Sequence, residues 1–211
     1  MRHFTKSDIN ELNKRNRANL INSVSGYKSA NLIGTISAAQ RTNLAIFSSV
    51  VHLGANPPLL GFIMRPIDEV ERHTYENIKE TGVYTINHVH RTFIEQAHYT
   101  SAKFDREVSE FAACKLTEEY LKNFAAPFVS ESIIKIGLKF VEEIPIKLNH
   151  TILMIGEIEH LVLPENVLLE NGNLDLNSVE DVCISGLDGY HEVGKAVRFK
   201  YAKAGEVPDF K

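Results

Sequence analysis

Short apolar runs of the kind that form strands recur along this chain, and helical segments do not alternate with them in a regular way. Ile134, Ile136 and Leu138 show the clearest pattern, because they alternate with small or charged residues, as in a half-buried antiparallel strand. A doubly wound parallel sheet needs a helix between successive strands, so that class is disfavoured. The pattern favours an antiparallel barrel or sandwich with helical excursions. The predicted strands span residues 30–38, 44–51, 59–64, 83–89, 134–140, 151–163 and 197–201.

The predicted helices are few and short. Residues 7–24 show a weak amphipathic period, with Ser7 as a candidate N-cap and Gly26 at the end. Residues 74–80 read as a short helix that Gly82 closes.

Three further segments complete the prediction. Residues 92–95 match a capping box, so a helix is expected to start there. Residues 118–124 predict a short helix, and the charged residues 99–111 are the best candidate for a mobile loop. We expect an N-terminal helical extension over residues 1–25 and a single domain over residues 26–211.

Charge and cysteine content disfavour several classes of function. The 23 Lys and Arg against 27 Asp and Glu give a net charge of -4, which argues against a nucleic-acid or polybasic membrane-surface protein. Cys114 and Cys183 form no Cys-x-x-Cys motif, so thiol redox chemistry is disfavoured. The first residues lack the apolar core of a signal peptide, and no stretch approaches the roughly 20 apolar residues of a membrane span. A cytoplasmic protein is predicted.

Histidines are the only candidate metal ligands that stand out. His88 and His90 share one face of a predicted strand, a spacing that can hold a metal ion. No further ligand follows at a convincing spacing, so we expect no metal site and two solvent-facing or hydrogen-bonded histidines.

Residues 31–87 carry the most informative constellation. Arg72, His73 and Thr74 stand at a predicted helix N-terminus, where free N–H groups and the helix dipole favour a phosphate. Arg65 could add a bidentate partner. Ser48 and Ser49 lie on an apolar strand, where their hydroxyls either bind backbone groups or donate to a polar ligand.

The order of these segments resembles the flavin reductase-like proteins with an FMN-binding split barrel, including flavoredoxin-like proteins. The resemblance runs over about residues 25–165 and rests on motifs in series. These are Asn-Leu-Ala-Ile-Phe-Ser-Ser at 43–49, Pro-Pro at 57–58, Arg-His-Thr-Tyr-Glu-Asn-Ile at 72–78 and Thr-Gly-Val-Tyr-Thr-Ile-Asn at 81–87. The family often has Asp before the helix Thr, where this chain has His73.

The resemblance implies a mainly β protein with short helices, folded as a Greek-key antiparallel split β-barrel. It also implies a homodimer with one FMN per subunit near the interface. The residues that match the strand along the flavin are Asn43, Ala45, Phe47, Ser48 and Ser49, and those that match the region around the phosphate are Arg65, His73 and Thr74.

The activity that follows from the resemblance is that of an FMN-binding oxidoreductase. Hydride would pass from NAD(P)H to the flavin and then on to an acceptor, with the flavin carrying the redox chemistry. No catalytic acid–base pair stands out, although His150, Tyr190 and His191 could border the open face of the ring. A non-catalytic FMN-binding electron carrier and a pyridoxamine-phosphate-oxidase-like enzyme are the alternatives.

Overall fold

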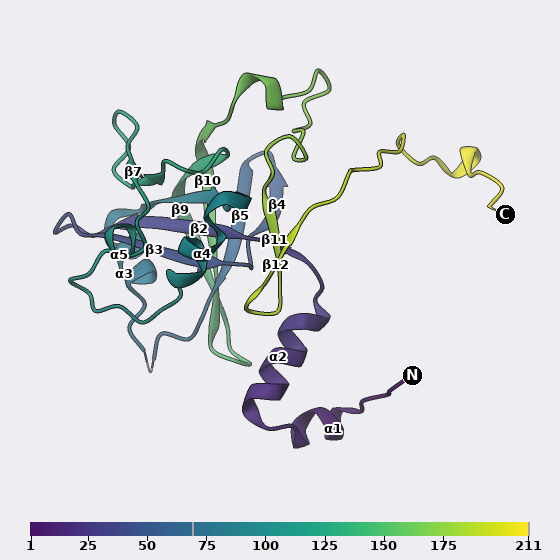
Figure 1. Ribbon diagram of the computed structural model, residues 1–211, viewed down its shortest axis with the longest axis horizontal. Coiled ribbons are helices and arrows are strands. Elements are labelled where there is room, and N and C mark those ends of the chain that lie inside the picture. The colour runs from purple at the N-terminus through teal and green to yellow at the C-terminus, as the bar shows by residue number, and fades with distance from the viewer. Residues whose placement is uncertain (69, 211) are drawn as a thin grey trace.

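The computed structural model describes residues 1–68 and 70–210, and its strands form antiparallel sheets (Figure 1). The main sheet has seven strands in the order β3-β2-β6-β9-β10-β5-β4, beside a three-stranded sheet, β1-β11-β12, and a two-stranded sheet, β7-β8. The strands are β1 (Lys28–Ser29), β2 (Asn31–Ile36), β3 (Thr42–Phe47), β4 (Val51–Ala55), β5 (Pro58–Met64), β6 (Val83–His88), β7 (Glu118–Glu119), β8 (Phe128–Val129), β9 (Lys135–Ile146), β10 (Thr151–Val162), β11 (Val182–Ser185) and β12 (Gly189–Glu192).

Short helices lie between the strands and at the two ends of the chain. They are α1 (Lys6–Glu11), α2 (Lys14–Val24), α3 (His73–Thr81), α4 (Ile94–Tyr99) and α5 (Glu110–Ala113), with 3₁₀ turns η1 (Arg91–Phe93), η2 (Glu165–Val167) and η3 (Ala204–Glu206). No helix in the described part of the chain is long and apolar enough to cross a membrane.

Strand β2, next to the edge strand β3, is covered on both of its faces. All of its residues are buried, and its sequence Asn-Leu-Ile-Gly-Thr-Ile is nearly continuous in apolar character. Gly34 is required there, since a Cβ atom at this position would lie 2.4 Å from the Pro127 carbonyl oxygen.

Two cores pack against the two faces of this part of the sheet. Ile33, Phe62 and Tyr84 belong to the core inside the barrel, and Leu32 and Leu44 belong to a second core. That second core also contains Phe93 of η1 and Phe111 of α5. Burying each large apolar side chain contributes about 1.5–3 kcal/mol, so α5 and the segment around η1 are held on the sheet by packing.

Two edge strands of the main sheet, β3 and β4, are connected by residues 48–50 and are not hydrogen-bonded to each other as a ladder. The Ser49 hydroxyl, which lies between them, accepts a hydrogen bond from the Ile63 N–H (3.1 Å) and donates to the Ile63 carbonyl (3.3 Å). The Ser49 side chain therefore ties the connection between β3 and β4 to β5, the neighbour of β4.

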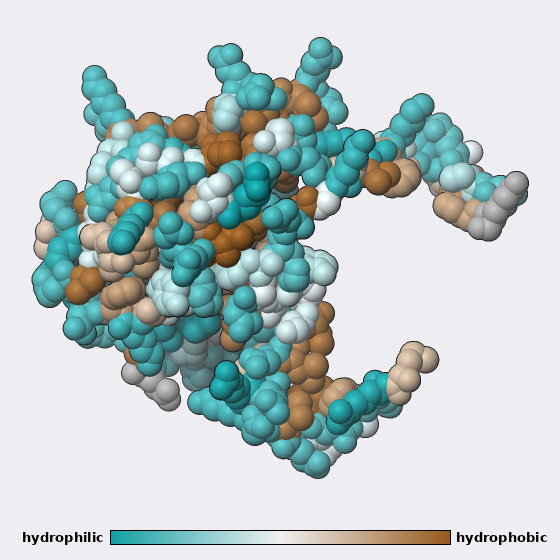
Figure 2. Space-filling model, in the orientation of Figure 1, coloured by the Kyte–Doolittle hydropathy of each residue, from teal (hydrophilic) through white to brown (hydrophobic). Residues whose placement is uncertain are grey.

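The two ends of the chain extend away from the barrel (Figure 1). Helices α1 and α2 contain no buried residue. Residues 193–210 form an extended arm whose only regular element is η3. Brown apolar side chains lie on both ends (Figure 2).

The predicted N-terminal helix is divided in two. Thr5, rather than Ser7, caps α1 in a reciprocal capping box with Asp8, and Asn13 caps α2. The helix at residues 74–80 is confirmed, and Gly82 ends it in the left-handed conformation with φ 74°.

Three local predictions are wrong. The helix expected to start at residues 92–95 is present as η1 and α4, but the capping box is not made, since His90 caps η1 and α4 has no side-chain cap. Residues 118–124 hold strand β7 instead of a helix, because Glu118 and Glu119 bind Thr42 and Lys135 in distant strands. Residues 197–201 form no strand within the chain.

Some strands escaped prediction because their signals are weak. The exposed edge strand β4 follows β3 after a connection of only three residues, 48–50, so residues 44–51 were predicted as one strand. Strands β11 and β12 have only four residues each.

Candidate functional site

A cleft of about 540 Å³ opens where β3 meets the N-terminus of α3. Its volume falls within the ~300–1,000 Å³ typical of small-ligand sites. One side, which we call the strand wall, consists of β3, residues 48–49 and the start of α3; the other, the loop wall, consists of residues 100–106. The structure brings all the predicted site residues together along this cleft: Asn43, Ala45, Phe47, Ser48, Ser49, Arg65, His73 and Thr74.

The N-terminus of α3 faces this cleft without a side-chain cap. Arg72 is the N-cap residue, His73 and Thr74 are the first two helical residues, and no side chain of the described residues caps the turn. The N–H groups of a first helical turn have no partner within the helix. Together with the dipole, they make this end suited to bind an anion.

Thr74 lies in a buried hydrogen-bond network. The Asn43 amide nitrogen donates to the Thr74 hydroxyl oxygen at 3.0 Å, and the Asn77 amide donates to Thr35 at 3.1 Å. Asn43 also contacts Thr35 at 3.4 Å. Thr74 does not cap the helix, because Arg72 holds the cap position. The hydroxyl accepts from Asn43, so its own proton can be donated to a ligand.

The two serines on this wall differ in what they can offer. Ser49 uses its hydroxyl as both acceptor and donor on the backbone of Ile63. Of the two roles that the sequence left open for these hydroxyls, Ser49 therefore has the first, that of binding backbone groups. Ser48 has no hydrogen-bond partner among the described residues and lines the same cleft. Of the pair, Ser48 is therefore the one whose hydroxyl is available to a ligand.

An aromatic series supports the strand wall from behind. Phe47 contacts Phe62 edge-on with ring centroids 5.0 Å apart, and Phe62 contacts Tyr84 in the same manner at 5.6 Å. The Tyr84 hydroxyl is buried without a partner, and burial raises its pKa. Gly156 makes room for it, because a Cβ atom there would lie 2.2 Å from that oxygen. Such edge-to-face pairs restrict ring motion, so Phe47 is held rigidly.

Two arginines lie at the end of the cleft next to the N-terminus of α3. Arg65 and Arg72 both line it, and burial followed by the charge of Arg65 lowers the pKa of Arg72. The Arg72 Nε atom donates to the Pro66 carbonyl at 3.2 Å. His73 Nε2 lies 3.7 Å from a Glu71 carboxylate oxygen. Two adjacent arginines repel each other, so an anion between them would be stabilised.

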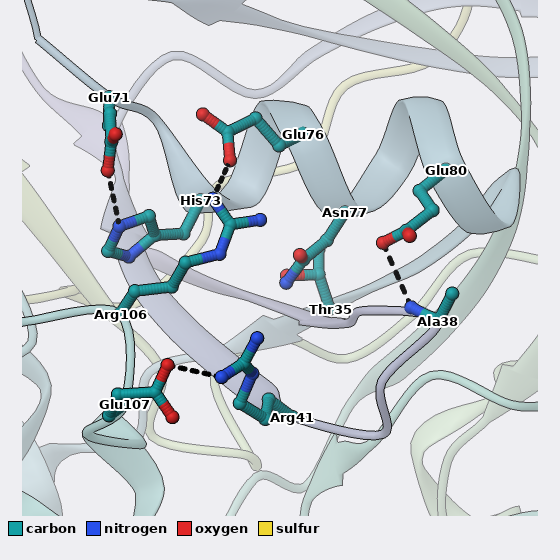
Figure 3. A network of polar contacts seen from close by, with 10 residues as sticks. All are labelled: Thr35, Ala38, Arg41, Glu71, His73, Glu76, Asn77, Glu80, Arg106 and Glu107. Carbon is teal, nitrogen blue, oxygen red and sulfur yellow. Dashed lines mark hydrogen bonds and ion pairs between the residues drawn. The ribbon is translucent and has the colours of Figure 1, made fainter.

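The loop wall was not predicted to contribute to the site. Arg106 pairs with Glu76 of α3, and the neighbouring Glu107 pairs with Arg41 (Figure 3). These ion pairs hold the loop against α3 on one side and the β2–β3 turn on the other. Residues 99–111 show no regular apolar periodicity, and their position in the fold depends on ion pairs with Glu76 and Arg41, which are distant in the sequence.

Glu110, at the end of this loop, is the functional candidate that sequence reasoning missed. Its carboxylate is 5% exposed, lines the cleft and accepts a hydrogen bond from the Leu44 N–H of β3 at 2.9 Å. Burial raises the pKa of Glu110, while the Leu44 N–H and the charge of His73 act in the opposite direction. The residue therefore links the loop wall to the strand wall.

The histidines highlighted by sequence lie elsewhere. His88 Nδ1 is 2.7 Å from Asp181 Oδ2, and His90 contacts Thr92 and Glu180. No group of three or more potential metal ligands comes together among the described residues.

The residues expected to border the flavin face are also outside the cleft lining. Tyr190 binds His98 at 3.1 Å, and burial followed by the charge of Asp188 raises its pKa to about 12. His191 binds Ser185, and the exposed His150 lies 3.9 Å from Asp68. None of the three lines the cleft, whereas Leu187 of the β11–β12 turn does.

Comparisons with solved structures agree with this fold. A structure from Shewanella frigidimarina, titled "putative flavin reductase with split barrel domain", has a TM-score of 0.92 and 51% sequence identity, covering 96% of this chain and 100% of that one. Flavoredoxin of Desulfovibrio vulgaris has a TM-score of 0.73 and 27% identity, covering 86% of this chain and 94% of its own.

A more distant structure shares the fold alone. Component B of nitrilotriacetate monooxygenase from Bacillus cereus has a TM-score of 0.82 at 19% identity, covering 94% of this chain and 98% of that one. The prediction of an antiparallel split barrel is confirmed.

Sequence comparison gives the family. An uncharacterized protein of Aquifex aeolicus is 28% identical over 144 residues, which is 68% of this chain and 72% of that protein. The profile described as "Flavin reductase like domain" matches residues 25–177. This chain, with its split barrel and its cleft between β3 and α3, belongs to the flavin reductase-like family.

Proposed function

We propose that this protein is an FMN-binding oxidoreductase that takes hydride from NAD(P)H and passes electrons to an acceptor. The observation that carries the proposal is the uncapped N-terminus of α3, which faces a cleft lined by every residue that the sequence assigned to FMN. Membership of the flavin reductase-like family supports the same function.

The residues of the cleft fit FMN in both chemistry and position. The free N–H groups of α3, the Thr74 hydroxyl and the Arg65 guanidinium would hold the phosphate. Ala45 and Phe47 would line the ring, since both belong to the part of β3 that lines the cleft. Ser48 supplies a free hydroxyl for a polar edge of the ring.

Bound FMN would supply the two-electron redox chemistry, which side chains cannot provide. This chain's own residues bind the phosphate, orient the ring through the rigid Phe47 side chain and limit water access through the loop wall. Nothing in the cleft is required as an acid–base pair for hydride transfer to take place.

We also propose a homodimer. Helix α2 has eleven residues and buries none of them. Isolated helices of that length are marginal in water, so α2 gains stability if it packs on a second chain. The cytoplasmic location and the boundary between residues 1–25 and 26–211 stay predictions.

The visible absorption spectrum of the purified protein, with the released cofactor identified, is the first test. We expect FMN to bind much more tightly than riboflavin, because the phosphate contributes charge-assisted hydrogen bonds. Equal affinity for the two flavins would contradict the phosphate site.

Steady-state oxidation of NADH and NADPH, with FMN added, tests the activity itself. Appreciable turnover with either nucleotide supports the oxidoreductase. FMN binding without turnover would point to the electron carrier. Oxidation of pyridoxamine phosphate in place of the nicotinamides would point to the other alternative.

A further inference from the structure

The C-terminal arm, residues 193–210, has the alternating apolar pattern of a strand, but it pairs with no strand in the described part of its own chain. Val197, Phe199 and Tyr201 alternate with polar or small residues, which is the period of a strand with one apolar face. Yet these side chains are 78%, 88% and 89% exposed, and the segment forms no strand. Exposed apolar groups of this size at regular spacing are typical of an interaction surface.

Hydrogen bonds fix the base of the arm. The Asn177 amide donates to the Gly194 carbonyl at 2.7 Å and accepts from the Ala196 N–H at 3.0 Å. Arg198 donates to the Leu174 carbonyl at 3.2 Å. Beyond Arg198, no hydrogen bond joins the described part of the arm to the barrel, and the arm runs outward from it (Figure 1).

One face of the barrel is also uncovered. Leu153 of β10 pairs with Ile63 of β5 and Ile144 of β9, and directly paired residues point to the same side of a sheet. Its neighbour Leu53 of β4 lies on this side too, because both leucine side chains contact the position where Gly61 would carry a Cβ atom. We call this the outer face; its exposed apolar members are Val51, Leu53, Val141 and Ile144.

The charges of the two surfaces are opposite. The arm carries Lys195, Arg198, Lys200 and Lys203 before its first acidic residue, Glu206. On the outer face, Glu142 is paired with Ile155, and Glu157 is paired with Leu59 on one side and with Lys139 on the other, so the face carries two carboxylates beside one lysine. Neither glutamate is in an ion pair among the described residues. Lys195 and Lys203 fall on the same side of the extended arm as Phe199 and Tyr201, so this side combines apolar groups with cations and fits an apolar face that carries carboxylates.

We propose that the arm of one copy lies across the outer face of a second copy, with Phe199 and Tyr201 on the apolar residues of β4 and β9. A two-fold axis makes the exchange reciprocal, so each copy covers the other. The inference rests on the proposed homodimer and adds which surfaces form it. Ile63 belongs to the row of paired residues on this face and also lines the cleft, so the arm would lie beside the proposed flavin site.

Photocrosslinking of the full chain tests the contact. A p-benzoylphenylalanine replaces Phe199, and ¹⁴N-labelled and ¹⁵N-labelled copies are mixed before irradiation. We expect mixed-isotope crosslinks from residue 199 to peptides that contain residues 51–55 or 141–146. The same probe in place of Lys200, on the other side of the extended chain, should give few of them. Crosslinks within one copy, to another face, or none at all would overturn the proposal.

Sedimentation over a dilution series separates this inference from the dimer itself. Phe199→Ser with Tyr201→Ser should raise the dimer dissociation constant at least tenfold, while the matched variant Lys200→Ser should change it little. Circular dichroism checks that both variants fold. A parent protein that is monomeric at micromolar concentration contradicts the proposed dimer, and this proposal with it. A dimer that the double serine variant leaves unchanged contradicts the arm contact alone.

Discussion

The two walls of the cleft are built in different ways. The strand wall rests on buried hydrogen bonds among Asn43, Thr74 and Thr35 and on packed aromatic rings. The loop wall is held by the exposed ion pairs of Arg106 and Glu107. Buried polar networks are costly to disturb, whereas exposed ion pairs contribute little and weaken in salt. One wall is therefore preorganised, and the other can adjust to what enters the cleft.

The largest expected effect on stability comes from Asn43→Ala, which disrupts the hydrogen bonds of the strand wall. The variant removes the donor to both Thr74 and Thr35, and it leaves the buried Thr74 hydroxyl oxygen without its donor, while Thr35 keeps its bond from Asn77. We expect a loss of about 3 kcal/mol in the free energy of unfolding, together with weaker FMN binding. Urea denaturation and flavin fluorescence measure the two effects. If Asn43→Ala is as stable as the parent, the two walls do not differ as described.

Thr74→Val separates the ligand from the fold within the same wall. The hydroxyl proton is available to the phosphate, so its loss should weaken FMN binding by about 1.5–3 kcal/mol, the contribution of a hydrogen bond to a charged group. Riboflavin, which has no phosphate, provides the control and should bind both proteins alike. Unchanged FMN affinity would mean that the phosphate lies elsewhere.

Glu110→Gln tests the link between the walls. The folded-state pKa of Glu110 is raised above its ordinary value of 4.5, so the ionised carboxylate lowers stability as pH rises through the raised value. Glutamine keeps an acceptor for the Leu44 N–H without the charge. We therefore expect Glu110→Gln to be more stable than the parent at neutral pH, with the difference shrinking as pH falls through the raised pKa and levelling off below pH 4.5.

Thermal unfolding over a pH series measures this effect. Glu110→Ala is the control, because it removes the acceptor as well and should be destabilised at every pH. A glutamine variant less stable than the parent at neutral pH would mean that the charge itself is needed.

The smallest effect is expected at the loop wall. Arg106→Ala breaks the exposed pair with Glu76 and should lower stability by only about 0.2–1 kcal/mol, less in high salt. FMN dissociation, followed by stopped-flow fluorescence, should respond more than stability does. A destabilisation comparable to that of Asn43→Ala would show that the loop is as firmly fixed as the strand wall.

The same contrast explains what the sequence could predict. Helix α3 was found because Gly82 ends it within the segment itself, and the residues along β3 were found through an ordered series of motifs. The positions of Arg106 and Glu110 depend on Glu76 and Leu44, which are distant along the chain. Local patterns contain no information on such pairings, so the loop wall was read only as a mobile segment.

The errors have the same origin. Glu118 and Glu119 lie in an extended segment because Thr42 and Lys135 bind their carboxylates, which overrides a weak helix preference. At residues 197–201 the alternation is genuine, but no strand of the same chain lies alongside to pair with it. A periodic pattern specifies which face is apolar and leaves open which chain covers it.

The Ser49 hydroxyl, bonded to both backbone groups of Ile63, affects which part of the barrel opens most easily. Neighbouring strands of the main sheet are joined by ladders of several hydrogen bonds, whereas β3 and β4 share none, and in the gap between them the Ser49 side chain holds their connection to β5. Native-state hydrogen exchange should therefore find the lowest opening free energy along this gap. A ligand in the adjacent cleft would bridge the two edges, so its arrival should slow amide exchange there while the ladders elsewhere remain unchanged.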